Sequence, residues 1–253
     1  MMMGSEQTPL TVGGQASSAA SSAASSQASS AVSSAVSSAV SSAALSEEDA
    51  CIPLRMVEAA SYCPRQAWYR FVACDDPINA DMQRGLNRHE VFGEQEVHPP
   101  EGEQIWRHLA VFAPRLGVSG VLDEVHVTPT RLIITEYKTT RRSAAIWEGV
   151  LMQLAAQHLA LREHAEAADG RWHGAPLPAE TLLRVYYTDS RRTREAAWTA
   201  ALDQRARAVI ALCQQIVRAP LPPPGTVGPR CGACQHEPIC LPFDLPKLQG
   251  AAR

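Results

Sequence analysis

Two short runs place charged side chains among apolar neighbours in a spacing that could build a hydrolytic metal site. Residues 121–127 hold Asp123, and residues 132–138 hold Glu136 and Lys138. Alternate side chains of a strand share a face, so Asp123 would lie with the valines of its run and Glu136 with Lys138. A charge among apolar groups is costly unless an opposite charge compensates it. Two carboxylates and an ammonium at the ends of adjacent strands would suit a metal-dependent phosphodiesterase.

The residue types define the chemistry that such a site could perform. Mg²⁺ and Mn²⁺ prefer oxygen ligands, which Asp123, Glu136 and the main-chain carbonyl of Tyr137 could provide. A bound ion makes its water more acidic and neutralises charge on a phosphate. Lys138 would orient that water or stabilise the transition state, and His89 is a candidate further ligand. The alternative is structural: Glu136 and Lys138 form an ion pair, and Asp123 caps a turn.

The cysteines form a second constellation. There are seven, an odd number in a chain without an export signal, which argues against a disulfide framework. Cys231, Cys234 and Cys240 lie within one short loop, and Cys63 is the leading candidate for a fourth thiolate. Zinc and a 4Fe-4S cluster both accept four thiolates, and spacing alone does not separate them. His236 also leaves a zinc site of three cysteines and one histidine open.

The strands that would position the acids follow from the hydrophobic periodicity. Three strand-like runs at 105–113, 118–127 and 131–138, separated by short turns, predict an antiparallel meander. The period then becomes helical over 144–163. A helix that crosses between strands would place the next run, 181–188, parallel to its neighbour.

Three more helices are predicted. One begins at Pro64 with Cys63 near its cap, since proline is favoured in the first helical turn. A polar helix over 80–96 would carry His89, and a last helix over 193–218 would end before a proline-rich segment.

Composition divides the chain into three parts. Residues 1–50 are predicted to be a disordered tail, because 16–44 are almost entirely serine and alanine and cannot bury enough apolar surface to fold. Residues 51–243 suit one domain, and 244–253 would be a C-terminal tail. No signal peptide pattern and no run of eighteen apolar residues is present, which predicts a cytoplasmic protein without a membrane partner. The net charge of -3 gives no global attraction to nucleic acid.

These motifs together resemble the CRISPR-associated RecB-like exonucleases, the fourth numbered Cas family, within the PD-(D/E)XK nuclease superfamily. The resemblance covers about residues 52–243. The matching motifs are, in order, Tyr62-Cys-Pro-Arg65, Arg88-His89, Gly120-Val-Leu-Asp123, Glu136-Tyr-Lys138, Gln153-Leu-Ala-Ala-Gln157 and Cys231, Cys234 and Cys240. Gln157 is a departure, because many RecB-like nucleases have a tyrosine there.

The resemblance implies an α/β fold, a RecB-like nuclease core with a mixed central sheet flanked by helices, and a cluster-binding region made from both ends of the domain. It implies that Cys63, Cys231, Cys234 and Cys240 hold a 4Fe-4S cluster. It also implies that His89, Asp123 and Glu136 bind Mn²⁺ or Mg²⁺ beside a catalytic Lys138. Gln153 would lie near the DNA substrate.

The biological role is likewise an implication of the resemblance. Members of the family trim single-stranded DNA overhangs and select prespacers by their flanking motif, together with CRISPR integrase proteins. Two alternatives stay open: a RecB-like iron-sulfur nuclease of DNA repair, and a binding module whose nuclease motif is inert.

Overall fold

The computed structural model describes residues 51–77, 99–139, 145–167 and 172–244. The predicted tail at 1–50 lies outside the described residues, as does the predicted helix at 80–96 with His89. Of the predicted C-terminal tail only residue 244 is described. Within the described residues, no helix is long and apolar enough to cross a membrane.

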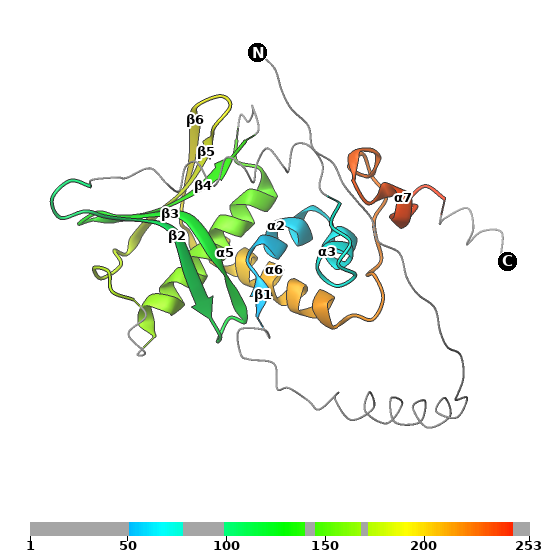
Figure 1. Ribbon diagram of the computed structural model, residues 1–253, viewed down its shortest axis with the longest axis horizontal. Helices are drawn as coiled ribbons and strands as arrows, with labels where there is room; N and C mark the ends of the chain where they lie inside the picture. The colour runs from blue at the N-terminus through cyan, green and yellow to red at the C-terminus, as the bar shows by residue number, and fades with distance from the viewer. Residues whose placement is uncertain (1–50, 78–98, 140–144, 168–171, 245–253) are drawn as a thin grey trace, which may run out of the picture. The chain divides into compact units, whose positions relative to one another are not determined.

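Six strands of the described chain form one mixed sheet (Figure 1). They are β1 (Ile52–Pro53), β2 (Gln104–Ala113), β3 (Val118–Val127), β4 (Arg131–Lys138), β5 (Glu180–Tyr187) and β6 (Arg192–Ala197). β2, β3 and β4 pair antiparallel in sequence order, and β5 pairs parallel with β4. The predicted meander and the parallel strand after it are therefore confirmed.

Helix α5 (Glu148–Glu166) connects β4 to β5 and packs against the sheet (Figure 1). The helix begins at residue 148 and ends at 166, whereas the predicted bounds were 144 and 163. Helices α2 (Arg55–Tyr62) and α6 (Ala200–Arg218) pack against α5, and α3 (Pro64–Phe71) follows α2. Because neighbours cover it on several sides, α5 is buried along most of its length rather than on one stripe. Two short helices, η1 (Cys231–Ala233) and α7 (Glu237–Cys240), come last.

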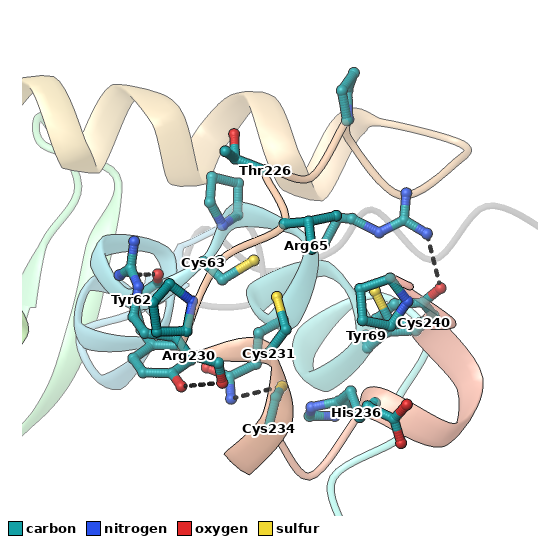
Figure 2. Close-up of a pocket in the computed structure, with 18 residues that line it drawn as sticks. Tyr62, Cys63, Arg65, Tyr69, Thr226, Arg230, Cys231, Cys234, His236 and Cys240 are labelled. Carbon is teal, nitrogen blue, oxygen red and sulfur yellow. Dashed lines mark hydrogen bonds between the residues drawn. The ribbon is translucent and has the colours of Figure 1, made fainter. Parts of the chain in front are cut away.

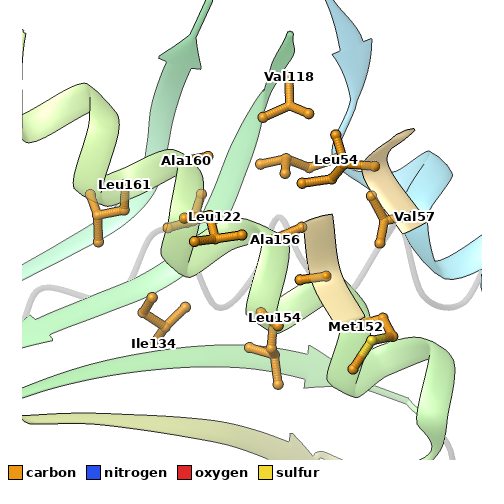
Figure 3. Close-up of a cluster of buried hydrophobic side chains, with 14 of the residues drawn as sticks. Leu54, Val57, Val118, Leu122, Ile134, Met152, Leu154, Ala156, Ala160 and Leu161 are labelled. Atoms are coloured by element: carbon orange, nitrogen blue, oxygen red, sulfur yellow. The ribbon is translucent and has the colours of Figure 1, made fainter. Parts of the chain in front are cut away.

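The core lies between the sheet and α5. Leu122 from β3 and Ile134 from β4 are fully buried and face Leu154 and Leu161 of α5 (Figure 3). Val57 of α2 extends the same cluster. Helix α5 is thus held rigidly over β4, the strand that ends in Glu136 and Lys138.

The start of the last predicted helix was wrong. Residues 192–197 form the edge strand β6, and α6 starts only at Ala200, where the Thr199 hydroxyl accepts a hydrogen bond from the amide of Leu202 at 3.2 Å. Charged residues and alanine suggest a helix, but charge is also how an exposed edge strand avoids pairing with other chains. Arg184 and Glu195 lie directly opposite each other on β5 and β6, with Nε and Oε1 2.8 Å apart. This cross-strand ion pair stabilises the hairpin.

Strand β3 changes partner along one edge. Its second half pairs with β4, and the last printed pair is Glu124 with Thr135. Its first two residues, Val118 and Ser119, pair instead with β1. Residues 120–123 have no strand partner on this edge in the described part of the chain, so β3 and β4 separate at Asp123.

The side chains of β3 also change face at this point. Val121 is 53% exposed whereas Leu122 is fully buried, so Asp123 does not share one continuous apolar face with Val121 and Val125, as the alternation predicted. On β2, His108 lies at the level of Asp123 and has a φ of 49°, which is unusual for a residue other than glycine. The sheet is therefore distorted on both strands where the acid lies.

The buried contacts of β4 give a test of the fold. Ile134→Ala should lower the free energy of unfolding by about 2–5 kcal/mol, because it removes a fully buried side chain between the sheet and α5. Val121→Ala, on the same sheet but 53% exposed, should change it by less than about 0.5 kcal/mol. Urea unfolding followed by circular dichroism measures both, and equal effects would contradict the assignment of the core.

Candidate active site and cysteine pocket

Asp123 lies where β3 and β4 separate. Its Oδ2 accepts a hydrogen bond from the amide of Tyr137 at 2.8 Å, in place of a main-chain partner on β3. Continuing the register beyond the pair of Glu124 and Thr135 would put Asp123 directly opposite Glu136. Two like charges in opposed positions of neighbouring strands repel each other. The separation of the strands therefore leaves the two carboxylates facing a common space.

Glu136 is almost entirely buried, with 5% of its surface exposed, and is surrounded by donors. Gln157 of α5 donates from Nε2 to Oε2 at 2.9 Å, and Gln153 donates to Oε1 at 3.2 Å. Burial raises the pKa of Glu136, Lys138 opposes this, and the charge of Asp123 adds to it, so that the net pKa lies above the ordinary value. The site thus holds a carboxylate whose negative charge is incompletely compensated.

Lys138 bridges two acids. Its Nζ lies 3.1 Å from Oε1 of Glu136 and 2.9 Å from Oε2 of Glu58, a residue of α2. Burial alone would lower the pKa of Lys138, but the two carboxylates outweigh it and raise the pKa above its ordinary value. The side chain is therefore a fixed ammonium ion at neutral pH and acts as a positive charge, not as a base.

Tyr137 points away from these groups but contributes its main chain. Its hydroxyl donates to Glu124 at 2.9 Å on the other side of β4. The N–H and C=O of one strand residue point toward the same neighbouring strand. Because the Tyr137 amide points to Asp123, its carbonyl also faces the space where the strands separate.

The donor set at this edge fits a hard divalent ion. Two carboxylates and a carbonyl are oxygen ligands of the kind that Mg²⁺ and Mn²⁺ prefer. The raised pKa of Glu136 indicates negative charge that a cation would stabilise. Among the residues described here, no three His, Cys, Asp or Glu side chains gather at the spacing of a metal site. His89 lies outside the described ranges.

The four predicted cysteine ligands line one cavity of about 260 Å³ between α3 and the segment that contains η1 and α7 (Figure 2). The cavity wall includes Cys63, Cys231, Cys234 and Cys240. None of them forms a disulfide. Burial raises the pKa of the Cys234 thiol, the backbone N–H of His236 lowers it, and the other three cysteines raise it further. The structure thus brings Cys63 together with three cysteines that lie more than 160 residues later in the sequence.

Several donors in this cavity would suit thiolate ligands. The Gln66 amide lies 3.8 Å from the sulfur of Cys234, and Arg65 hydrogen-bonds Cys240. Hydrogen bonds to sulfur and nearby positive charge are known to tune iron-sulfur clusters. His236 stacks on Tyr69, and its Nε2 lies 2.8 Å from the carbonyl of Asp75. A carbonyl only accepts, so Nε2 donates this hydrogen bond, and Nδ1 is buried without a partner among the described residues.

Comparison with known proteins decides the family. Residues 24–241 match the family model of the PD-(D/E)XK nuclease superfamily, which is most of the chain. The chain belongs to the PD-(D/E)XK nuclease superfamily. This confirms the predicted α/β nuclease fold, and the matched range includes Asp123, Glu136 and Lys138.

Three curated relatives are similar to this chain over most of its length. A "CRISPR-associated exonuclease Cas4/endonuclease Cas1 fusion" of Geobacter sulfurreducens is 30% identical over 213 residues, or 79% of this chain and 36% of the relative. A fusion with the same description from Rhodospirillum rubrum is 29% identical over 78% of this chain and 34% of the relative. A "CRISPR-associated exonuclease Cas4" of the same organism is 29% identical over 78% of this chain and 60% of the relative. The chain therefore spans about a third to three fifths of these relatives.

The structure brings together most of the site residues that the sequence predicted. Asp123, Glu136, Lys138 and Gln153 lie at one end of β4, and the four cysteines lie in a separate cavity. Glu58 was missed, since a single glutamate in a short helix gives no sequence signal. Gln157 had a signal, its position one turn after Gln153, but its contact with Glu136 was not foreseen.

The raised pKa of Glu136 predicts that ionisation of this buried carboxyl lowers the stability of the protein at neutral pH. An acid whose pKa is raised on folding is stabilising below its unfolded pKa, and this stability is lost as the pH rises through the folded pKa. In metal-free buffer, Glu136→Gln should therefore increase the free energy of unfolding at pH 8 by about 0.5–2 kcal/mol, and by less at pH 5. Urea titrations at the two pH values measure the difference.

Glu163 provides a matched control for this substitution. It is a buried glutamate of α5 whose carboxylate accepts from the amides of Arg115 at 2.6 Å and Leu116 at 3.1 Å. Glu163→Gln should lower stability, because an amide cannot accept both bonds in the same geometry. A loss of stability in both variants would contradict the electrostatic reading of Glu136.

Proposed function

We propose that this chain is a metal-dependent deoxyribonuclease that cleaves single-stranded DNA or overhangs and processes prespacers in CRISPR adaptation. The observation that carries the proposal is the position of two carboxylates near the ammonium of Lys138. Asp123 binds the Tyr137 amide where β3 and β4 separate, and Glu136 at the end of β4 is in an ion pair with Lys138. The similarity to proteins described as CRISPR-associated exonucleases supports the same activity. DNA is the substrate, and the integrase proteins of the CRISPR system are the partners. Such an enzyme would act in the cytoplasm.

In this proposal Asp123, Glu136, the carbonyl of Tyr137 and His89 hold Mn²⁺ or Mg²⁺. A bound ion would supply an acidic water as nucleophile and would neutralise charge on the scissile phosphate. The protein residues then have separate tasks. Gln153 and Gln157 keep Glu136 oriented by donating to its two oxygens, and Gln153 also lies close to Lys138 and the substrate.

Lys138 supplies positive charge where the phosphate gains negative charge. Its side chain cannot swing away freely, because Glu58 and Glu136 hold it from two sides. A fixed charge that needs no reorganisation stabilises a transition state more effectively than a mobile one. Glu58 is therefore a positioning residue, which acts on the reaction through Lys138.

The cysteine cavity would hold a 4Fe-4S cluster on Cys63, Cys231, Cys234 and Cys240. The cluster would have a structural role, because it joins α3 to the end of the domain. Residues 51–243 would form the nuclease domain, with 1–50 and 244–253 as tails.

Replacing Lys138 tests the catalytic assignment. Lys138→Met keeps the length of the side chain and removes the charge, and should reduce Mn²⁺-dependent cleavage of labelled single-stranded DNA by at least about 10²-fold. Arg131→Met is the matched control, since Arg131 lies at the other end of β4 in an exposed ion pair with Glu180. Its cleavage rate should be unchanged. Full activity of Lys138→Met in a folded protein would reject the role of Lys138, and no cleavage by the wild type would favour an inert binding module.

Replacing single cysteines tests the cluster. Anaerobically purified protein should be brown and contain about four iron atoms per chain. Cys63→Ser should lose the visible absorption and most of the iron, whereas Cys74→Ser, which alters an exposed cysteine outside the cavity, should keep both. A colourless wild-type protein with one zinc ion would show that the cavity holds zinc. Co-purification with integrase proteins would then separate a role in CRISPR adaptation from one in DNA repair.

A further inference from the structure

Three side chains, one of them half-buried, form a cluster at the edge of the cysteine cavity, whose wall includes Tyr62 and Arg230. The rings of Tyr62 and Trp147 lie 5.8 Å apart between centroids at an angle of 58°. The guanidinium of Arg230 lies over the Tyr62 ring, 5.2 Å from the ring centroid. Trp147 is 39% exposed, which is a large exposed fraction for tryptophan, and Arg230 is also exposed. We call these three residues the aromatic platform.

The aromatic platform is held rigidly by its neighbours. The Tyr62 hydroxyl donates to the carbonyl of Arg230 at 2.9 Å, and the Arg230 guanidinium donates back to the carbonyl of Tyr62. The Trp147 ring lies against Gly149, where any side chain would overlap it. The six-membered ring of the tryptophan therefore packs against the backbone of α5 at Gly149.

Two helices place the aromatic platform one turn from the candidate active site. On α2, Tyr62 follows Glu58 by four residues, and Glu58 binds Lys138. On α5, Gly149, which supports the Trp147 ring, precedes Gln153 by four residues, and Gln153 binds Glu136. Residues four apart lie on the same face of a helix, about 6 Å from each other. Both helices thus lead from the candidate active site to the pair of Tyr62 and Trp147.

We propose that the aromatic platform binds single-stranded nucleic acid next to the scissile phosphate, with a base stacked on Trp147 and a phosphate on Arg230. This inference rests on the proposed nuclease function and extends it. Exposed aromatic rings beside a cation are the elements of single-strand recognition, because every base has a face that can stack and every nucleotide a negative charge. Bases within a duplex are already stacked on each other and cannot use the ring. The platform therefore selects unpaired nucleotides beside the site of cleavage.

Binding of labelled oligothymidylate without divalent ions tests the proposal separately from cleavage. Trp147→Leu should weaken binding at least about fivefold, since stacking of one base contributes about 1–3 kcal/mol. Trp147→Phe should keep most of the affinity. Phe243→Leu, at another exposed aromatic residue, is the matched control and should bind as the wild type does. Binding to a blunt duplex of the same length should not change in any of them.

Two further variants keep the test decisive if Trp147→Leu folds poorly. Gly149→Ala should displace the Trp147 ring and weaken single-strand binding, although alanine is the better helix former. Arg230→Met should reduce the slope of log affinity against log salt by about 0.7, the value for one phosphate of a single strand. Unchanged single-strand affinity in folded Trp147→Leu and Gly149→Ala, or an equal loss on duplex, would overturn the proposal. A wild-type protein that binds single strands through Trp147 but does not cleave them would reject the nuclease function and still support the aromatic platform as a binding site.

Discussion

The placement of two carboxylates, the half-buried Asp123 and the buried Glu136, at the point where β3 and β4 separate is the constraint on which the arrangement around them depends. Asp123 and Glu136 would be a directly opposed pair if β3 and β4 continued in register. Like charges in those positions repel, and burial makes the repulsion stronger. The strands separate at this level, and the first two residues of β3 pair with β1 instead of β4. The opening in the sheet therefore lies where direct opposition of the two charges would be unfavourable.

The helices around this opening supply the side chains that hold Glu136 and Lys138 in place. Helix α5 contributes amide donors from Gln153 and Gln157, and α2 contributes Glu58, which holds Lys138 from the side opposite Glu136. Helix α2 ends at Tyr62, directly before Cys63 of the cysteine cavity. One short helix thus touches both functional regions. A change in the cavity that moved Cys63 would reach Lys138 through a rigid element of two turns.

The sequence predicted the elements of this arrangement better than their junctions. The prediction of the strands that carry Asp123 and Glu136 was confirmed, because apolar residues recur strongly in buried strands. The edge strand at 192–197 was assigned to a helix, because an exposed strand has no buried face to produce a pattern. The contact of Glu58 with Lys138 joins residues 80 positions apart and depends on how α2 packs on α5. Tertiary contacts of this kind leave no trace in local spacing.

Gln157 illustrates how the site gives up stability for its arrangement. One amide group donates to Glu136, while its Oε1 is buried without a hydrogen-bond partner among the described residues. An unsatisfied buried acceptor costs about 1–3 kcal/mol. Turning the amide over would direct its oxygen at the carboxylate and increase the repulsion, so the present orientation is fixed by the charge of Glu136. The unsatisfied oxygen, the raised pKa of Glu136 and the unusual backbone of His108 all occur at one level of the sheet. Departures from good local packing are often found where a protein has a functional task, and these three lie together around the acids.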